Sequence, residues 1–328
     1  MALRRVGRPR ANTSKPEERL MASILDGSMT VGVVGLGYVG LPLALEFAKS
    51  GIRTIGIDTS EEKIKLLQAG KNYIQDLDDV AVREVVKKTK KLWATTDFGV
   101  AGECDVIYIC VPTPFTPNKD PDISHIVHAT KGVAQHLRKG QLVILKSTTF
   151  PGTTDKYVKP ILDATKLQCG RDYFLAFSPE RIDPGNTTWT TKNTPVVVGG
   201  VTNACTDLAI AVNKRIINDV VPVSSPAVAE MEKLLENIFR SVNIALVNEL
   251  AQLCDRLGIN IWEVVDAAKT KPFGFMPFYP GPGIGGHCIL IDPYYLSWAA
   301  REVDFVTNFI TLAAEVNESM PFYVRAMI

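Results

Sequence analysis

One stretch of the sequence places a cysteine, a carboxylate and several glycines close together: GPGIGGHCILID, residues 281–292. Glycine and proline before Cys288 let the backbone turn sharply and bring its amides close to a ligand. Asp292 comes four residues after Cys288, so a helix that begins at the cysteine would carry both side chains on one face. A thiol at a helix N-terminus becomes more acidic and more nucleophilic. The stretch therefore predicts a nucleophilic cysteine, with a buried structural cysteine behind an ordinary turn as the alternative.

A second glycine-rich stretch joins a short apolar run to a helical pattern near the start of the chain. The run Thr30–Val34 has the length of a strand, and GLGYVG follows it directly at residues 35–40. Gly35 permits a tight turn, Gly37 lets a pyrophosphate approach the backbone, and Gly40 lets the following helix pack on the strand. The start of that helix offers amides and its dipole to phosphates. This arrangement predicts a dinucleotide site.

An acidic residue closes the next predicted strand. Arg53–Ile57 runs into Asp58, 23 residues after Gly35. A carboxylate at this place accepts both hydroxyls of the adenosine ribose and repels a 2′-phosphate. We therefore expect NAD rather than NADP as the cofactor, and a glycine turn without a ligand is the alternative.

Further apolar runs of strand length alternate with helical patterns. They are Val106–Val111, Leu142–Lys146, Phe174–Phe177 and Val196–Val198. Continuous apolar runs indicate strands that are buried on both faces. The sequence therefore predicts an α/β protein with an N-terminal, Rossmann-type, doubly wound and mainly parallel sheet.

Polar residues follow these runs at the points where the strands should end. Thr113, Ser147–Thr149 and Glu180 stand there. Ligands of such sheets bind beyond the carboxyl ends of the strands, so these residues are candidates for the site. Turn or helix-cap chemistry is the alternative for each of them.

A long helix is predicted for Pro226–Leu257, with a serine cap before it and Gly258 after it. At 1.5 Å per residue it would run roughly 45–50 Å, which is too long for a crossover within a sheet. We therefore expect it to bridge two domains. Lys233 and Asn237 share one face of it, either as site residues or as solvated surface.

The same helix is also strongly apolar, and the rest of the chain is too small to cover it. We therefore expect a homodimer formed through the region from Pro226 to about Ser319. The apolar residues are Leu234, Leu235, Ile238, Phe239, Ile244, Leu246, Val247 and Leu250.

These patterns divide the chain into four segments. Residues 1–28 form a basic tail that we expect to be disordered, and residues 29–223 form the NAD-binding domain. Residues 224–319 form the long helix and a mainly helical dimerisation domain that carries Cys288. Residues 320–328 are the expected start of a linker.

Composition excludes several classes of partner. Of 328 residues, 46% are hydrophobic and 22% charged, as in ordinary globular proteins. The net charge of +1 gives no field that would attract nucleic acid or an anionic membrane, and no apolar run has the length of a membrane span. The six cysteines are scattered without disulfide or metal-ligand spacing. That pattern favours a reducing compartment such as the cytoplasm and argues against a metal site.

Six motifs support a resemblance to a known family. They are GLGYVGLPLA (35–44), VPTP (111–114), STTFPGTT (147–154), SPERIDPGN (178–186), EKLLEN (232–237) and FYPGPGIGGHCILIDPYYLSW (278–298). In these motifs the chain resembles the UDP-glucose/GDP-mannose dehydrogenase family, and especially its UDP-N-acetylglucosamine 6-dehydrogenase branch. Similar enzymes oxidise the C6 alcohol of a UDP-sugar to a carboxylate with two NAD, using one site twice.

The resemblance implies a role for each matching residue. Cys288 would attack an intermediate aldehyde, and the thiohemiacetal would become a thioester, while Lys233 and Asn237 hold the C6 oxygen. Glu180, Thr148 and Asp292 would position or activate water. The implied NAD site comprises Gly35, Gly37, Tyr38, Val39, Gly40, Asp58, Lys63, Thr113 and Thr148. The implied UDP-sugar site comprises Glu180, Lys233, Asn237, Phe278, Tyr279, Gly281 and Gly285.

Two departures from the family pattern bear on the substrate and on activity. The UDP-glucose branch generally has a lysine before the aspartate that follows the catalytic cysteine, and here that residue is Ile291. With His287 and the run FYPGPG, this favours an N-acetylhexosamine substrate, most of all UDP-N-acetylglucosamine, over UDP-glucose; UDP-N-acetylmannosamine stays an alternative. The family also has a C-terminal α/β domain that binds UDP, and the chain stops where its linker would begin. We therefore expect a truncated enzyme that lacks this domain.

Two other readings stay open. A two-electron dehydrogenase of the 6-phosphogluconate or hydroxyacid kind shares the plan of a Rossmann domain and a long helix, but it has no use for Cys288. A truncated chain could also bind NAD and dimerise without turnover.

Overall fold

The computed structural model describes residues 15–75, 77–181, 188–285 and 287–328, and it leaves the side chains of residues 287–291 undescribed. Within this part of the chain, eight strands form one sheet in the order β3-β2-β1-β4-β5-β6-β7-β8. Neighbouring strands are parallel except for β6 and β7. The strands are β1 (Thr30–Val34), β2 (Arg53–Ile57), β3 (Leu92–Thr95), β4 (Val106–Ile109), β5 (Leu142–Leu145), β6 (Phe174–Phe177), β7 (Val196–Gly200) and β8 (Val220–Val223). The predicted Rossmann-type sheet is confirmed.

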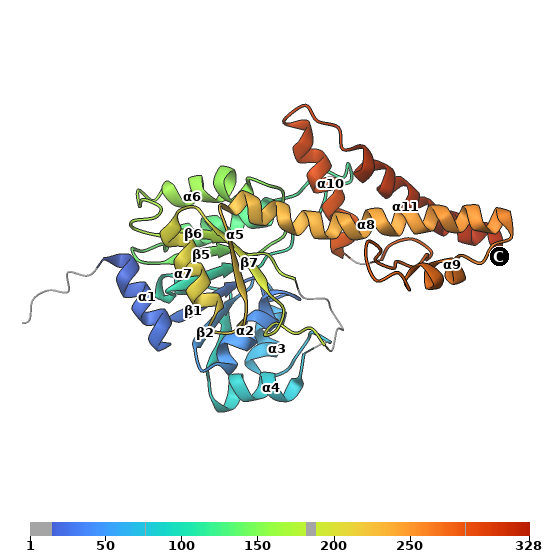
Figure 1. Cartoon of the computed structure of the whole chain (residues 1–328). Helices are drawn as coiled ribbons and strands as arrows, with labels where there is room; N and C mark the ends of the chain where they lie inside the picture. The colour runs from blue at the N-terminus through green and yellow to red at the C-terminus, as the bar shows by residue number, and fades with distance from the viewer. Residues whose placement is uncertain (1–14, 76, 182–187, 286) are drawn as a thin grey trace, which may run out of the picture.

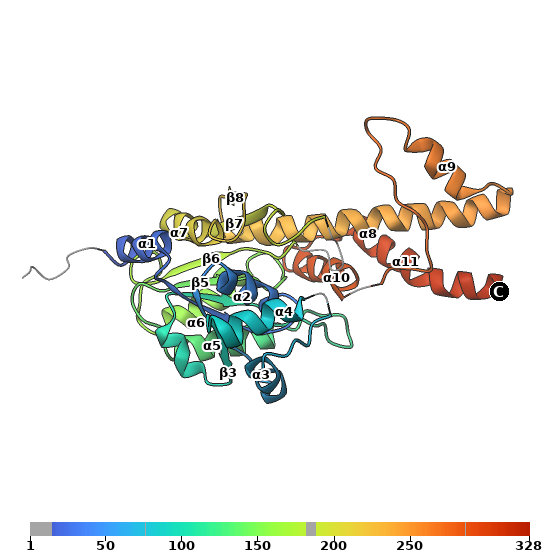
Figure 2. The same ribbon diagram turned by 90° about the horizontal axis from the view of Figure 1, so that it is seen from below.

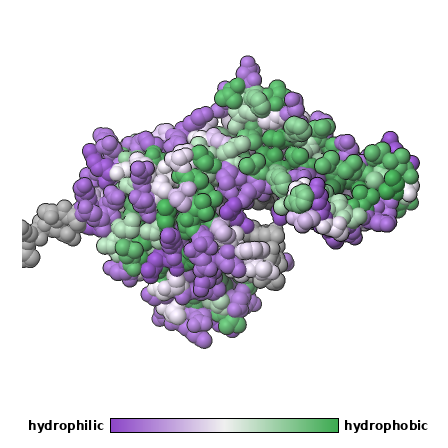
Figure 3. All heavy atoms as spheres, viewed as in Figure 1, coloured by the Kyte–Doolittle hydropathy of each residue, from purple (hydrophilic) through white to green (hydrophobic). Residues whose placement is uncertain are grey.

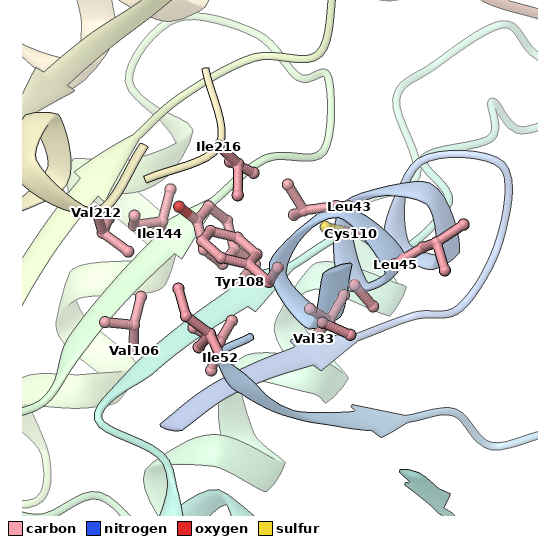
Figure 4. Close-up of a cluster of buried hydrophobic side chains, with 14 of the residues drawn as sticks. Val33, Leu43, Leu45, Ile52, Val106, Tyr108, Cys110, Ile144, Val212 and Ile216 are labelled. Atoms are coloured by element: carbon pink, nitrogen blue, oxygen red, sulfur yellow. The ribbon is translucent and has the colours of Figure 1, made fainter. Parts of the chain in front are cut away.

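Helices cover both faces of this sheet (Figure 1). Alternate residues of a strand point to opposite faces, so Tyr108 of β4 packs in one core and Ile109 in the other. Figure 4 shows the first core, where the Tyr108 hydroxyl donates to Asn213 Oδ1 at 3.3 Å. The helices around the sheet are α1 (Pro16–Asp26), α2 (Gly40–Lys49), α3 (Glu61–Gln68), α4 (Asp79–Arg83), η1 (Glu84–Lys88), η2 (Phe98–Glu103), α5 (Ser124–Ala134), η3 (Thr154–Val158), α6 (Lys159–Asp163) and α7 (Asn203–Asn213).

We expected residues 1–28 to be disordered, but residues 16–26 form helix α1. Leu20 and Ile24, one turn apart, are buried in the first core. Arg215 Nη1 donates to the carbonyl of Leu25 at 3.1 Å and fixes the last turn of the helix. Two apolar residues in a charged helix are a weak signal, and this is why the sequence pattern missed it. Residues 1–14 lie outside the described part of the chain.

Strands β3 and β8 were also missed by the apolar pattern. Both lie at edges of the sheet. β8 contains Pro222, and proline is tolerated in an edge strand because no neighbour needs its missing N–H. Each has partly or fully exposed residues, so neither reads as a continuous buried run.

The second part of the molecule is built on α8, which spans Pro226–Leu257 as predicted. Ser225 Oγ accepts from Val228 N at 3.4 Å at its start, and Gly258 ends it with φ = 66°. Figures 1 and 2 show α8 leaving the sheet and extending well beyond it. The other helices of this arm are α9 (Ile261–Ala268), α10 (His287–Arg301) and α11 (Asn308–Met327). Among the helices that the structure describes, none is long and apolar enough to cross a membrane.

The segment expected to begin a linker, residues 320–328, is helical through Met327 as the last turns of α11. It packs on α8: the Tyr323 hydroxyl donates to Asp255 Oδ2 at 2.8 Å, and Met320 is buried. Pro321 lies inside this helix. Proline is a helix-breaking signal, but the contacts with α8 outweigh it here.

Glu230 fixes the first turns of α8 to the sheet domain. This fully buried carboxylate accepts from Gly152 N at 2.5 Å, Thr154 N at 2.9 Å and Thr154 Oγ1 at 2.7 Å. Burial raises the pKa of Glu230, and these hydrogen bonds oppose the rise. The carboxylate therefore joins α8 to the loop that follows β5.

We predict that Glu230→Gln destabilises the protein by about 1–3 kcal/mol, because an amide NH₂ would face backbone N–H donors that need an acceptor. Chemical denaturation with both variants at one pH measures the effect. Glu249→Gln, at an exposed position of the same helix, is the matched control and should change stability by less than about 0.5 kcal/mol. An equally small effect at Glu230 would contradict the anchoring role.

Candidate active site

The glycine loop after β1 has the shape that its sequence predicts. Gly35 has φ = 90°, and a Cβ there would lie 2.6 Å from the carbonyl oxygen of Cys110. A Cβ at Gly40 would lie 1.8 Å from the carbonyl oxygen of Gly35, so only glycine fits at both places. A Cβ at Gly37 would meet no atom within 4 Å. The loop therefore leaves open space at Gly37, directly before the start of α2, where a pyrophosphate fits.

Asp58 holds this loop at the end of β2. Its carboxylate is 8% exposed and accepts from Leu36 N at 2.8 Å and from Ser60 N at 2.9 Å. Lys63 Nζ lies 3.1 Å from Asp58 Oδ2. Of the other loop residues, Tyr38 is exposed and Val39 is the N-cap of α2. The acid and the loop form one cradle, and their chemistry fits a dinucleotide with a free ribose 2′-hydroxyl.

The loops after β4 and β5 are joined to each other beside this cradle. Thr113 Oγ1 donates to the carbonyl of Thr148 at 2.8 Å, and Ser147 Oγ donates to the carbonyl of Val111 at 2.7 Å. Thr113 and Thr148, which the sequence predicted as site residues, are therefore in direct contact at the carboxyl end of the sheet.

Glu180, after β6, faces a lysine that the sequence analysis did not single out. Lys146 is 1% exposed, and its Nζ lies 3.3 Å from Glu180 Oε2 and donates to the carbonyl of Pro179 at 3.2 Å. A buried ammonium needs such partners. The signal was present in the sequence, because Lys146 closes an otherwise apolar strand.

Arg181 links the end of β6 to α8. Its guanidinium pairs with Glu232 at 2.8 Å and with Glu236, and it donates to the carbonyl of Pro195 at 3.0 Å. Burial, together with the neighbouring Glu236, raises the pKa of Glu232 to about 7, and Arg181 opposes that rise. Arg181, the residue after Glu180, is thus held against the turns of α8 that flank Lys233.

Lys233, Asn237 and Asp292 form the junction of α8 and α10. Asn237 Nδ2 donates to Asp292 Oδ2, and Asp292 is 2% exposed. Burial raises the pKa of Asp292 to about 6, although the Asn237 hydrogen bond and the charge of Lys233 lower it. The structure therefore brings together three predicted residues from positions up to 59 apart, around a carboxylate that titrates near neutrality.

Helix α10 begins at His287, one residue before Cys288. The position of Cys288 near a helix start agrees with the spacing argument, and Asp292 follows one turn later on the same helix. The side chain of Cys288 lies outside the described residues.

Tyr295, a buried residue that the sequence analysis also missed, joins α10 to the loop after β4. Its hydroxyl donates to the carbonyls of Thr113 and Pro114, the second at 2.9 Å. Nearby, Lys119 Nζ donates to Glu318 Oε1 at 2.7 Å. Because these partners are more than 180 residues apart for Tyr295 and 199 apart for Lys119, no local pattern could reveal them.

The remaining predicted residues lie further along the arm. Phe278 packs edge-on against Phe239 of α8, with ring centroids 5.9 Å apart. Gly281 N donates to Asn248 Oδ1 at 3.0 Å, and Gly285 is exposed. The Tyr279 hydroxyl donates to Asp266 Oδ1 at 2.8 Å at the end of α9. The described contacts therefore tie Tyr279 to α9 and not to Asn237 or Asp292.

Two family models match the chain. The NAD binding domain of the UDP-glucose/GDP-mannose dehydrogenase family matches residues 29–217, and the central domain of that family matches residues 227–319.

Individual relatives agree with these matches. The chain is 38% identical over 303 residues to a UDP-N-acetyl-D-glucosamine 6-dehydrogenase of Pseudomonas aeruginosa, covering 92% of this chain and 70% of the relative. It is 37% identical over 301 residues to a UDP-N-acetyl-D-mannosamine dehydrogenase of Pyrococcus horikoshii, covering 92% and 71%. A solved UDP-D-ManNAc dehydrogenase structure from Pyrococcus horikoshii superposes with a TM-score of 0.85 at 36% identity, covering 91% of this chain and 70% of that one. With its fold, its cradle and both matched domains in agreement, the chain belongs to the UDP-glucose/GDP-mannose dehydrogenase family and is an oxidoreductase with NAD as its cofactor.

Proposed function

We propose that the enzyme oxidises the C6 hydroxyl of a UDP-N-acetylhexosamine to the uronic acid in two successive two-electron steps. Our first choice for this substrate is UDP-N-acetylglucosamine. The observation that carries this proposal is the cluster of Lys233 and Asn237 of α8 with the buried Asp292 of α10. Asp292 lies one turn after Cys288 on α10. A simple alcohol dehydrogenase needs a base and a group that stabilises an oxyanion, but it needs no cysteine.

In the first step the C6 hydroxyl loses its proton to a base while its oxygen is held. Lys233 supplies a cation and Asn237 an amide donor toward that oxygen, so both stabilise the developing negative charge. Asp292, or Glu180 and Thr148 through a water molecule, takes the proton. Bound NAD supplies the acceptor for the hydride that leaves C6 in each of the two oxidations.

The second oxidation needs a covalent intermediate, because an aldehyde has no hydroxyl to deprotonate. The Cys288 sulfur adds to the aldehyde carbon, and the oxygen takes a proton, which gives a thiohemiacetal. The thiohemiacetal then loses a hydride from C6 and the proton of its hydroxyl group, which leaves a thioester on Cys288. Water activated by Asp292 or Glu180 then attacks the thioester, and the carboxylate and the Cys288 thiolate are released.

Two observations support an N-acetylhexosamine over UDP-glucose. Ile291 stands where the UDP-glucose branch has a lysine, and the relatives from Pseudomonas aeruginosa and Pyrococcus horikoshii carry names of N-acetylhexosamine dehydrogenases. The sugars in these two names differ in configuration at C2, so UDP-N-acetylmannosamine is the alternative substrate. The five cysteines with described side chains are free thiols, which suits a cytoplasmic enzyme.

We also propose a homodimer through the arm, because apolar side chains are exposed along it. On α8, Leu235 is 58%, Leu246 54% and Leu257 61% exposed, and Trp262 of α9 is 55% exposed. Figure 3 shows hydrophobic residues gathered over this arm, in contrast to the more polar sheet domain. Monomeric proteins rarely expose apolar surface of this extent.

We predict that the protein is a dimer in solution and that Leu246→Glu together with Leu257→Glu shifts it toward the monomer, because both changes place charge in the proposed interface. Light scattering over a range of concentrations measures the mass. Val80→Glu, at an equally exposed apolar position of the sheet domain, is the control and should leave the mass unchanged. A wild-type protein that is monomeric at every concentration would contradict the proposal.

We predict that the stability of the wild type falls relative to Asp292→Asn as pH rises from 5 to 7. The pKa of Asp292 is raised from 3.8 to about 6 in the folded protein, so its stabilising contribution is present below pH 3.8 and is lost as pH rises through about 6. Over the whole pH range the difference amounts to at most about 3 kcal/mol, of which about 1.3 kcal/mol falls between pH 5 and pH 7. Denaturation curves of the two variants at pH 5 and pH 7 give it directly.

The same residue should shape the activity profile. We expect the kcat/KM of the wild type to rise as pH increases through about 6, where Asp292 ionises, and this rise should be missing from the residual activity of Asp292→Asn. An unchanged profile in the variant would exclude Asp292 as the proton acceptor.

The experiment that tests the proposed function concerns Cys288. The wild type should release two NADH per UDP-N-acetylhexosamine, and a quenched reaction should carry a sugar adduct on Cys288. Cys288→Ser is a poorer nucleophile, so turnover to the acid should fall by about 10³-fold or more while NAD binding persists. Cys288→Ala should form no adduct.

A panel of UDP-N-acetylglucosamine, UDP-N-acetylmannosamine and UDP-glucose identifies the substrate in the same assay. Release of one NADH per sugar would favour a two-electron dehydrogenase. NAD binding without NADH formation from any sugar would leave only a dinucleotide-binding role. Two NADH per sugar from Cys288→Ala would refute the thioester route.

A further inference from the structure

Two further cysteines meet at the amino-terminal end of β6, an internal strand of the sheet. Cys169 lies in the loop before β6, and Cys205 lies in the first turn of α7. The Cys169 thiol donates a hydrogen bond to the Cys205 sulfur. Since Glu180 follows the opposite end of β6, this pair is separate from the proposed active site.

The Cys205 sulfur is surrounded by hydrogen-bond donors. Besides Cys169, it accepts from Thr202 Oγ1 at 3.1 Å and from Leu175 N at 3.3 Å. Hydrogen bonds, with that of Cys169 the largest, lower the pKa of Cys205 below its usual range against the opposing effect of burial. Donating its proton to Cys205, together with burial, raises the pKa of Cys169. Of the two, Cys205 is therefore the sulfur that ionises first, and Cys169 is its hydrogen-bond donor.

The loop that carries Cys169 packs closely against the start of α7, which carries Cys205. Gly170, next to Cys169, has φ = 80°, and a Cβ there would lie 2.8 Å from Thr202 Cγ2. Thr202 in turn caps α7 by accepting from Cys205 N at 3.3 Å. Backbone and cap thus hold Cys169 against Cys205.

A cavity of about 470 Å³ opens beside the pair, and Cys169 and Thr202 are part of its wall. Lys159, Lys166 and Arg171 also line it. Cys169 is partly exposed, whereas Cys205 is fully buried behind it. A small solute in the cavity therefore meets the Cys169 sulfur first.

We propose that Cys169 and Cys205 form a redox-active dithiol, which a hydroperoxide entering this cavity oxidises to a disulfide. As the Cys169 sulfur attacks one peroxide oxygen, its proton passes to the Cys205 thiolate, the O–O bond breaks and hydroxide leaves. Hydroxide takes the proton back from Cys205 and becomes water. The Cys205 thiolate then attacks the Cys169 sulfenic acid, the S–S bond forms, and a second hydroxide leaves. Two thiols lose two electrons, and one hydrogen peroxide becomes two molecules of water once solvent protonates the second hydroxide.

The other described cysteines do not share these features. Burial raises the pKa of Cys104 and of Cys110 to about 12, and among the described residues no second cysteine acts on either thiol. Cys254 lies partly buried on α8. It provides the comparison for an ordinary thiol.

The test is peptide mapping of the full chain after treatment with hydrogen peroxide at pH 7.5. Trypsin releases Cys169 in the peptide Leu167–Arg171 and Cys205 in Asn193–Lys214. We expect a linked product of these two peptides, two hydrogens lighter than their sum, which dithiothreitol separates again. It should form at least about ten times faster than Cys254 is oxidised, because Cys205 lies ready to accept the Cys169 proton and then to close the disulfide.

Matched variants make the result decisive. Cys169→Ser and Cys205→Ser should each abolish the linked peptide, and Cys254→Ser should leave its rate unchanged. The oxidised wild type should also unfold at a higher temperature than the reduced form, because the new bond restricts the unfolded chain. Should Cys205→Ser fail to fold, Cys169→Ser alone tests the assignment, since it removes only the partly exposed sulfur. Two unlinked peptides under conditions that have already oxidised Cys254 would overturn the proposal.

Discussion

The structure depends on one buried carboxylate, Glu230, which fixes the long helix α8 to the loop after β5 through Gly152 and Thr154. A helix rises by a constant 1.5 Å per residue, so anchoring one turn fixes the turns that follow. Lys233 lies about one turn after Glu230, and Asn237 about two turns after it. The anchor therefore sets where both side chains stand relative to the sheet, although Glu230 belongs to neither proposed binding set.

Two further contacts repeat this arrangement at neighbouring strand ends. Arg181, after β6, is held by Glu232 and Glu236 of α8, and Tyr295 of α10 bonds to the loop after β4. The carboxyl ends of β4, β5 and β6 are therefore each tied to the arm. Thr113 and Thr148 lie on the sheet side and Asp292 on the arm side. The distance between the proposed cofactor site and the proposed catalytic residues therefore depends on these contacts rather than on any single domain.

The features that could be predicted from the sequence are those whose determining residues lie close together in the chain. A strand, three glycines and Asp58 fall within 29 residues, and α8 carries its caps at its own ends. Helix α1 and the edge strands β3 and β8 were missed because tertiary packing, and not a local pattern, stabilises them. Glu230 and Tyr295 were missed for the same reason, because each acts through a partner at least 76 residues away. Lys146 was overlooked although it closes an otherwise apolar strand. The grouping of Lys233, Asn237 and Asp292 came from family resemblance, since spacing alone joins only the first two.

The two carboxylates of the proposed site stand in different surroundings, and this difference bears on how they divide the chemistry. Asp292 is buried beside the amide of Asn237, and burial outweighs both this hydrogen bond and the charge of Lys233, so its pKa rises to about 6. Glu180 instead faces the buried ammonium of Lys146 at 3.3 Å. A group that titrates near the working pH exchanges a proton at little cost in free energy, whereas a carboxylate paired with a fixed cation keeps its orientation. We therefore infer that Asp292 exchanges the proton in each oxidation, and that Glu180 orients the water that attacks the thioester.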